Sequence, residues 1–265
     1  FYNLRFPRPL ISQLYFFIMI NDFKIKDNNG ENINYIYHIS DIHIRTGNNE
    51  QSRYNEYLYV FKNLKKTIKS NNDLKQSILI ITGDIFHHKN LIESSGIELF
   101  SFLIKELTKL LPVFIIMGNH DYRQDNIDDT DLLSALINNS NYKNIYYLEK
   151  TGVYTINNLA IGVMAINDIL LSGDTSGMIQ NIPPFPNPNN INSDHKIALY
   201  HGIIIVEDNE FFLKLNKGIK SDWFSNYDYA LLGDIHTQQV NNILDKSNKS
   251  DKLNNNIIDI SDNNK

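Results

Sequence analysis

Residues 78–87 read ILIITGDIFH, and this stretch decides the fold class. Its first four residues are all apolar, which is typical of a short strand in a parallel sheet that is covered on both faces. The strand is followed at once by Gly83, Asp84 and His87. Glycine at such a position lets the backbone turn sharply and approach a ligand closely. We therefore expect a buried strand whose carboxyl end carries chemically useful side chains.

Strands and helices alternate on both sides of this stretch. Residues 33–39 alternate apolar and polar side chains, as a strand does, and two stretches have apolar residues at helical spacing. The helices are predicted over 53–68 and 97–111, and further strands over 113–117, 153–156, 159–164, 197–200 and 229–232. Asn157-Asn158 predicts a hairpin turn, and the proline-rich residues 182–188 predict a loop. The order predicts an α/β layered domain with helices outside and its site at the C-terminal strand ends.

Five of the predicted strands are followed by Asp, Asn or His. These residues are Asp41 and His43, then Asp84 and His87, then Asn119, His120 and Asp121, then His201, and last Asp234 and His236. Because parallel strands end at the same edge of a sheet, their exit loops converge on one cleft. Oxygen and imidazole ligands in this number are what two divalent ions about 3.5–4 Å apart require. We expect a dinuclear metal site there.

Composition limits the chemistry further. The chain has 265 residues, 42% of them hydrophobic and 21% charged, which is ordinary for a globular protein. It has no cysteine, which excludes a disulfide framework, a thiol nucleophile and a zinc–thiolate site. The net charge is −5, so no global basic field attracts nucleic acid, although bound divalent cations can receive a phosphate backbone.

The motifs Asp-x-His, Gly-Asp, Gly-Asn-His-Asp, His and Gly-x-x-His, in this order over residues 33–239, resemble those of the calcineurin-like metallophosphoesterases. Within that superfamily, Gly-Asp-Ile-Phe-His at 83–87 is most similar to the SbcD-type DNA double-strand-break repair exonucleases. The resemblance implies a layered β-sandwich with flanking helices. It also implies hydrolysis of phosphodiester bonds in DNA by a metal-bridging hydroxide, because two metal ions lower the pKa of a shared water.

The resemblance also implies a role for each site residue. The first ion would be held by Asp41, His43 and His236, both ions would be bridged by Asp84, and the second ion would be held by Asn119 and His201. His120 matches the catalytic histidine that protonates the leaving oxygen, Asp121 would orient its imidazole, and His87 would lie near the substrate. His38, His88 and His195 are expected to be structural or surface residues.

Two departures from the family pattern leave alternatives open. Asp234 stands where the family usually has a histidine ligand of the second ion, and an oxygen ligand favours Mn²⁺ or Mg²⁺, with Fe²⁺ also compatible. The chain also becomes rich in Asn and Lys soon after Gln239, which puts a capping domain and an SbcC-like ATPase partner in doubt. The alternatives are a phosphodiesterase or phosphatase acting on nucleotides or phosphoproteins, and a degenerate scaffold without catalysis. A homodimer is compatible with either.

The two ends differ from the middle in composition. We expect residues 1–18 to be an upstream extension, with Met19 as the true start, residues 19–240 to be the metallophosphoesterase domain, and residues 241–265 to be a tail or a truncated continuation. The apolar run at 10–20 is too short to span a bilayer and lacks the cleavage site of a secretory signal. We therefore expect no membrane association and an intracellular location, whether cytoplasm, nucleus or viral factory.

Overall fold

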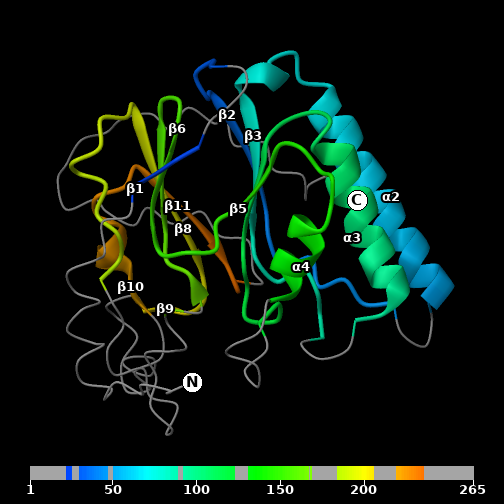
Figure 1. Cartoon of the computed structure of the whole chain (residues 1–265). Helices are drawn as coiled ribbons and strands as arrows, with labels where there is room; N and C mark the ends of the chain where they lie inside the picture. The colour runs from blue at the N-terminus through cyan, green and yellow to red at the C-terminus, as the bar shows by residue number, and fades with distance from the viewer. Residues whose placement is uncertain are drawn as a thin grey trace, which may run out of the picture.

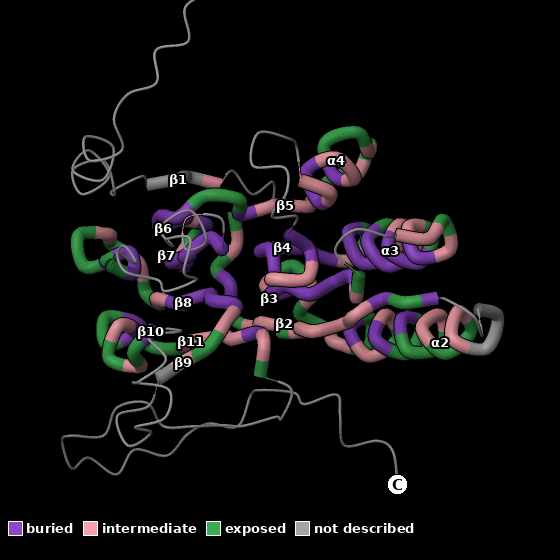
Figure 2. The backbone as a smooth tube through the Cα atoms, turned by 90° about the horizontal axis from the view of Figure 1, so that it is seen from below, coloured by how far each residue is buried: buried purple, intermediate pink, exposed green. Residues whose placement is uncertain are grey.

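Two β-sheets lie face to face, and helices cover the outer face of one of them (Figure 1). The structure is a computed structural model that describes residues 22–25, 30–46, 50–88, 92–122, 131–166, 168, 184–205 and 219–235. Figure 2 shows the buried strands in the middle of this arrangement, with the exposed residues gathered on the helices and on the outer loops. The predicted α/β layered sandwich with flanking helices is confirmed.

The first sheet is entirely parallel and contains the stretch with which the sequence analysis began. Its order is β2 (Tyr35–Ile39), β3 (Ser77–Thr82), β4 (Val113–Ile116) and β5 (Ile145–Tyr147). All six residues of β3 are buried, which explains why its sequence is almost wholly apolar. β5 has only three residues and was not predicted from the sequence.

Three α-helices lie on the outer face of this sheet: α2 (Glu50–Lys69), α3 (Ser94–Leu107) and α4 (Leu132–Asn138) (Figure 1). The face of α3 that meets the sheet is apolar, with Leu99, Leu103 and Leu107 buried among strand residues. The helix predicted at 97–111 begins three residues earlier, at Ser94, and ends at Leu107. After Leu107 the chain leaves the helix through tighter turns, in which the amides of Leu110 and Leu111 both bond the Leu107 carbonyl. The short α4 was not predicted.

The second sheet has the order β1 (Asp22–Lys24), β6 (Gly152–Ile156), β7 (Leu159–Val163), β8 (His195–His201) and β11 (Tyr229–Gly233). The predicted hairpin is confirmed, since β6 and β7 are antiparallel and the turn residue Asn157 has a φ of 50°. The other neighbours in this sheet pair in parallel. The space between the two sheets holds a core of isoleucine, leucine and aromatic side chains.

Small elements cover the outer face of the second sheet. They are the strand pair β9 (Ile204–Ile205) and β10 (Ile219–Lys220), the 3₁₀ turn η2 (Ser221–Phe224), and residues 184–188. Residues 184–188 have no regular structure, as their prolines predicted. Phe185, Phe224 and Tyr227 pack there against Tyr200. A further 3₁₀ turn, η1 (Leu74–Gln76), leads into β3.

Strands from both sheets end on the side where the site lies. The amide of Asp41, after β2, donates to the carbonyl of Gly83, after β3, at 3.1 Å. The amide of Asp234, after β11, donates to Oδ1 of Asp41, also at 3.1 Å, so this bond joins the two sheets. The sequence argument placed these exits at the edge of one sheet, whereas two sheets supply them. No helix in the described part of the chain is long and apolar enough to cross a membrane.

Candidate metal centre

Four of the predicted metal ligands have an unusual backbone conformation. Asp41, His43, Asp84 and Asp234 have φ angles of 54°, 48°, 52° and 69°, in the left-handed region that non-glycine residues seldom adopt. Residues held in such conformations cluster at functional sites, where the surrounding structure enforces them. Each of these residues lies in the loop that follows a strand, so the backbone turns there instead of continuing the strand.

Asp84 occupies the middle of the centre, and its side chain is fully buried. Its Oδ2 atom lies 3.6 Å from Nε2 of His43, and its Oδ1 atom lies 3.2 Å from Nε2 of His201. Oδ1 also accepts a hydrogen bond of 2.8 Å from the amide of His120. The two carboxylate oxygens thus face two different imidazoles, as a carboxylate that bridges two metal ions must do.

His201 is held so that one particular ring nitrogen faces Asp84. Its Nδ1 atom lies 2.6 Å from the carbonyl oxygen of Thr82, and a carbonyl only accepts, so Nδ1 carries the hydrogen. This leaves Nε2 to face the carboxylate. A metal-ligating histidine usually donates its other N–H to a carbonyl or carboxylate in this way. Ser40 Oγ donates to the same Thr82 oxygen at 3.0 Å and helps to position it.

In the protein without metal, Asp84 and His201 each stabilise the charged form of the other. Burial by itself raises the pKa of Asp84. This effect is outweighed by the hydrogen bond and the charge of His201 and by the hydrogen bond from the His120 amide, so the pKa of Asp84 lies below its ordinary value. Burial lowers the pKa of His201, and the neighbouring Asp84 carboxylate outweighs this, so that its pKa lies above the ordinary value. A bound divalent cation would replace the proton as the partner of the carboxylate.

The donor atoms fit divalent metal ions. Two oxygens of predicted ligands, Oδ2 of Asp84 and Oδ1 of Asn119, are among the buried side-chain atoms without a hydrogen-bond partner in the described part of the chain. Buried polar atoms are nearly always satisfied, so these two oxygens point to a missing ligand. Both are lone-pair donors of the kind that Mn²⁺, Mg²⁺, Fe²⁺ and Zn²⁺ accept.

Two glycines make room for these donors. A Cβ atom on Gly118 would lie 2.2 Å from both the amide nitrogen and Oδ1 of Asp84. A Cβ atom on Gly233 would lie 2.3 Å from Nδ1 of His201 and 2.2 Å from the Thr82 carbonyl. Any other residue at either position would push a predicted ligand out of place.

The donors form two groups of different chemistry. Asp41, Asp84 and His201 each offer one atom, and these three atoms lie within 4.8 Å of one another. His43, His87 and His120 form a second group under the same limit, and each of these side chains is half-buried. We call them the oxygen-rich group and the histidine group. They adjoin each other, since His43 Nε2 is also 4.0 Å from Oδ1 of Asp41.

The structure gives Asp121 a different role from the one that the resemblance implies. Its buried carboxylate accepts hydrogen bonds from three backbone amides, those of Ile85, Phe86 and Gly118, at 3.0–3.2 Å. Burial raises the pKa of Asp121 to about 6, and these donors act against a larger shift. Asp121 therefore ties the loop after β3 to the loop after β4, and its hydrogen bonds go to backbone amides and not to the imidazole of His120.

A main-chain atom positions His120 instead. Nδ1 of His120 lies 2.6 Å from the carbonyl oxygen of His87, so Nδ1 carries the hydrogen and Nε2 is left for chemistry. The rings of His87 and His120 are stacked, with centroids 5.7 Å apart. Burial, followed by the charges of His88, Arg45, His43 and His120, lowers the pKa of His87. No sequence pattern signals a backbone carbonyl, so the roles of Thr82 and His87 as hydrogen-bond acceptors were missed.

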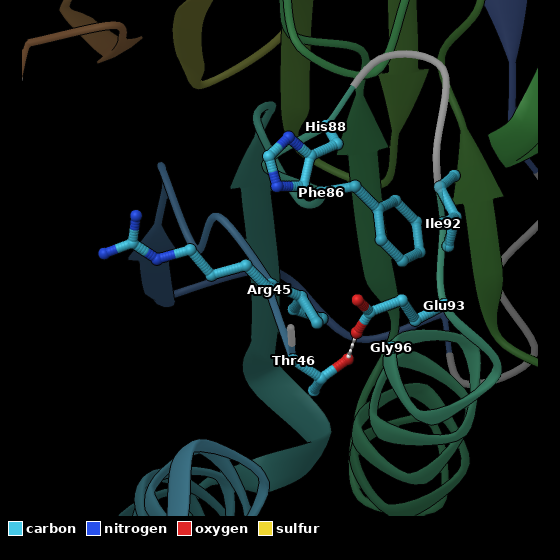
Figure 3. Close-up of a pocket in the computed structure, with 8 residues that line it drawn as sticks. Arg45, Thr46, Phe86, His88, Ile92, Glu93 and Gly96 are labelled. Atoms are coloured by element: carbon cyan, nitrogen blue, oxygen red, sulfur yellow. Dashed lines mark hydrogen bonds between the residues drawn. The ribbon is translucent and has the colours of Figure 1, made fainter. Parts of the chain in front are cut away.

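A small pocket adjoins the histidine group through His88 (Figure 3). Phe86 and Ile92 form its apolar wall, and the Thr46 hydroxyl donates to the Glu93 carboxylate at one end. The guanidinium of Arg45 points away from this pocket in Figure 3. His88 and His195 are exposed, as expected. His38 has a structural contact, since its Nε2 lies 2.7 Å from the Thr82 hydroxyl.

Two predicted ligands remain, Asp234 and His236, and the structure describes only the first. Asp234 follows β11 beside Asp41 and bonds it through its amide, but its carboxylate belongs to neither group. His236 lies outside the described residues.

Comparison with known proteins identifies the class. The calcineurin-like phosphoesterase family model matches residues 35–238. "Uncharacterized protein R555" of Acanthamoeba polyphaga mimivirus is 35% identical over 222 residues, which are 83% of this chain and 16% of that protein. The chain thus spans a small part of this relative.

Two solved structures are similar at low identity. A nuclease, MPE, from Pseudomonas putida has 15% identity and a TM-score of 0.31, over 64% of this chain and 62% of its own. Protein AQ665 of Aquifex aeolicus, of unknown function, has 16% identity and a TM-score of 0.29, over 73% of this chain and 94% of its own.

The family match covers most of the chain and includes every donor described above. The chain belongs to the calcineurin-like phosphoesterase family. Membership implies a hydrolase of phosphoesters that uses divalent metal ions, which agrees with the donor atoms found here.

Proposed function

We propose that this chain is a manganese-dependent phosphodiesterase that cleaves DNA in the manner of the SbcD-type nucleases. The observation that carries the proposal is the position of Asp84, whose two oxygens face His43 and His201 while its Oδ1 also accepts the His120 amide. This arrangement supports the assignment of Asp84 as a bridging carboxylate and of His120 as the neighbouring acid. The match of residues 83–87 to the nuclease motif and the stacking of His87 on His120 support the narrower assignment.

We divide the residues that would hold the metal ions as the family resemblance implies. Asp41 and His43 would hold one ion, Asn119 and His201 the other, and Asp84 both. When bound, two such ions neutralise the phosphate oxygens and lower the pKa of the attacking water. The many oxygen donors favour Mn²⁺ over Zn²⁺.

His120 would supply the proton to the leaving oxygen. Its Nδ1–H is held by the His87 carbonyl, so the second ring proton, when present, is on Nε2. Histidine suits this task, because its unperturbed pKa of about 6.5 allows proton exchange near neutral pH. Asp121 would contribute indirectly, by fixing the loop that carries His120 to the loop that carries His87.

One observation favours a different substrate. The net charge of −5 provides no broad attraction for a long polyanion, and a small nucleotide or another diester needs none. A phosphodiesterase acting on small diesters is therefore the second candidate.

The test uses end-labelled linear duplex DNA and a generic aryl phosphodiester, each with Mn²⁺. The parent protein is compared with His120→Ala and with a matched control, His195→Ala, whose imidazole is exposed at the start of β8. We expect the parent and the control to degrade DNA and His120→Ala to lose at least about 10²-fold in rate. Turnover of the aryl diester alone would replace the nuclease assignment by the second candidate. Turnover of neither substrate would contradict the proposal.

A further inference from the structure

We propose that His43, His87 and His120 form a second metal site, which shares His43 with the dinuclear centre and takes a nitrogen-preferring transition-metal ion, Zn²⁺ above all, and that zinc bound there inhibits the enzyme. The site is the histidine group defined above. It differs from the dinuclear centre of the family in its ligands, because it recruits the candidate acid His120 and the loop residue His87 in place of carboxylates.

The three imidazoles already converge. Their ligand atoms lie within 4.8 Å of one another. The ring of His43 is nearly perpendicular to both partners, with centroids 4.9 Å from His120 and 5.5 Å from His87. A tetrahedral zinc ion with bonds of about 2.0–2.1 Å needs nitrogens about 3.3 Å apart. All three side chains are half-buried and lie in loops after strands, and zinc binding requires their ring nitrogens to approach one another from within 4.8 Å to this separation.

A second observation points to metal ligation by His120. Its Nδ1–H donates to the backbone carbonyl of His87, which leaves the Nε2 lone pair of the neutral ring for a metal. Ligating histidines usually have such a partner on the other nitrogen. His201 has the same arrangement with the Thr82 carbonyl, at the same distance of 2.6 Å, in the oxygen-rich group. One histidine of each group thus has a ring nitrogen fixed by a backbone carbonyl.

The chemistry of the two groups separates the ions they prefer. The oxygen-rich group contributes two carboxylates, which suit Mn²⁺ and Mg²⁺. The histidine group contributes three imidazole nitrogens and leaves a fourth position open, which is a common zinc geometry. Zn²⁺ also binds nitrogen ligands more tightly than Mn²⁺ does in general. The three imidazoles would therefore hold zinc more tightly than manganese, and zinc bound there would share His43 with the dinuclear centre.

Zinc in the histidine group has a direct consequence for catalysis, which rests on the proposed function. It would occupy Nε2 of His120, so that this nitrogen no longer donates a proton to the leaving oxygen. It would also compete for His43, which the first ion of the dinuclear centre needs. Free zinc would then act as a reversible inhibitor of the manganese enzyme.

The binding test does not depend on activity. Zinc affinity is measured by competition with a chromophoric chelator, and Co²⁺ is used as a visible probe, because tetrahedral Co²⁺ absorbs much more strongly than octahedral Co²⁺. The parent is compared with His87→Asn and with the control His88→Asn, whose ring packs on His87 but lies outside the histidine group. The same comparison is repeated in an Asp84→Asn background, which lacks the bridging carboxylate. Circular dichroism verifies that each variant is folded.

We expect His87→Asn to weaken zinc binding at least tenfold and to reduce the Co²⁺ band in both backgrounds, while His88→Asn matches its parent. Equal zinc affinity in His87→Asn and its parent would overturn the proposal, and so would an equal loss in His88→Asn. In the activity arm, zinc added to the manganese-loaded parent should suppress hydrolysis. If the manganese-loaded parent hydrolyses nothing, the proposed function fails while the binding result still decides this inference.

Discussion

Replacement of Gly118 by alanine tests the packing on which the metal centre depends. The new Cβ atom would lie 2.2 Å from the amide nitrogen and from Oδ1 of Asp84. Neither atom belongs to the far end of a flexible side chain, so the loop after β3 or the loop after β4 must move. A shift of about 0.8 Å is needed to bring the contact to an acceptable separation of about 3 Å.

The cost follows from this overlap. Overpacking in a rigid core typically costs about 1–3 kcal/mol, and the backbone contact places Gly118→Ala near the upper end. For a domain of this size, about 3 kcal/mol lowers the melting temperature by about 6–12 °C. Because the displaced group is the bridging carboxylate, the variant should also bind Mn²⁺ at least tenfold more weakly. Urea unfolding without metal and a Mn²⁺ titration measure the two effects separately.

The matched control is Gly96→Ala in helix α3. Its Cβ atom would meet only Ile44 and Ile92, at 3.5 and 4.0 Å, which is ordinary van der Waals contact. Alanine is favoured over glycine within a helix, so this variant should gain about 0.5–1 kcal/mol and bind Mn²⁺ as the parent does. A Gly118→Ala protein with the parent's stability and metal affinity would refute the reasoning.

Two further predictions concern buried and exposed acids. Asp121→Asn should destabilise the protein by about 1–3 kcal/mol in urea unfolding, because the amide nitrogen that replaces one carboxylate oxygen cannot accept a hydrogen bond from a backbone N–H. Unchanged stability would contradict the role given to Asp121. Hydrogen bonds from Lys109 and Lys65 lower the pKa of Glu106 to about 2, so this carboxylate stabilises the fold above its ordinary pKa of 4.5 and loses the effect as the pH falls toward 2. Because the pairs are partly exposed to solvent, Glu106→Gln should cost only about 0.5–1 kcal/mol at pH 7. This difference should shrink steadily in unfolding series from pH 5 to pH 3, and a difference independent of pH would contradict the assignment.

Local sequence patterns predicted the parts of the fold that are long or strongly apolar. The buried strands β3 and β4 and the hairpin of β6 and β7 follow from apolar runs and from the Asn157 turn. The short elements α4 and β5 have too few residues for a helical or strand periodicity of apolar residues to be recognised in the sequence. β1 pairs with Val153–Thr155, which is more than a hundred residues away in the chain, and no local pattern predicts such a contact.

For the site as well, local sequence patterns predicted some contacts and missed others. The expectation that Asp41, His43, Asp84 and His201 meet is consistent with the structure, since polar residues after strand ends converge. The resemblance implied that Asp121 orients His120, whereas the structure shows its carboxylate bonded to the amides of Ile85, Phe86 and Gly118; its part in catalysis stays a prediction. Whether Asp234 and His236 ligate metal remains a prediction.

The number of metal ions bound by the parent protein and by Asp84→Asn tests the central claim most directly. The two carboxylate oxygens of Asp84 face different imidazoles, those of His43 and His201. Equilibrium dialysis against Mn²⁺ should therefore give two ions per chain for the parent and the loss of both tightly bound ions for a folded Asp84→Asn variant. A parent that binds no more than one ion, or an Asp84→Asn variant that still binds two, would contradict the account.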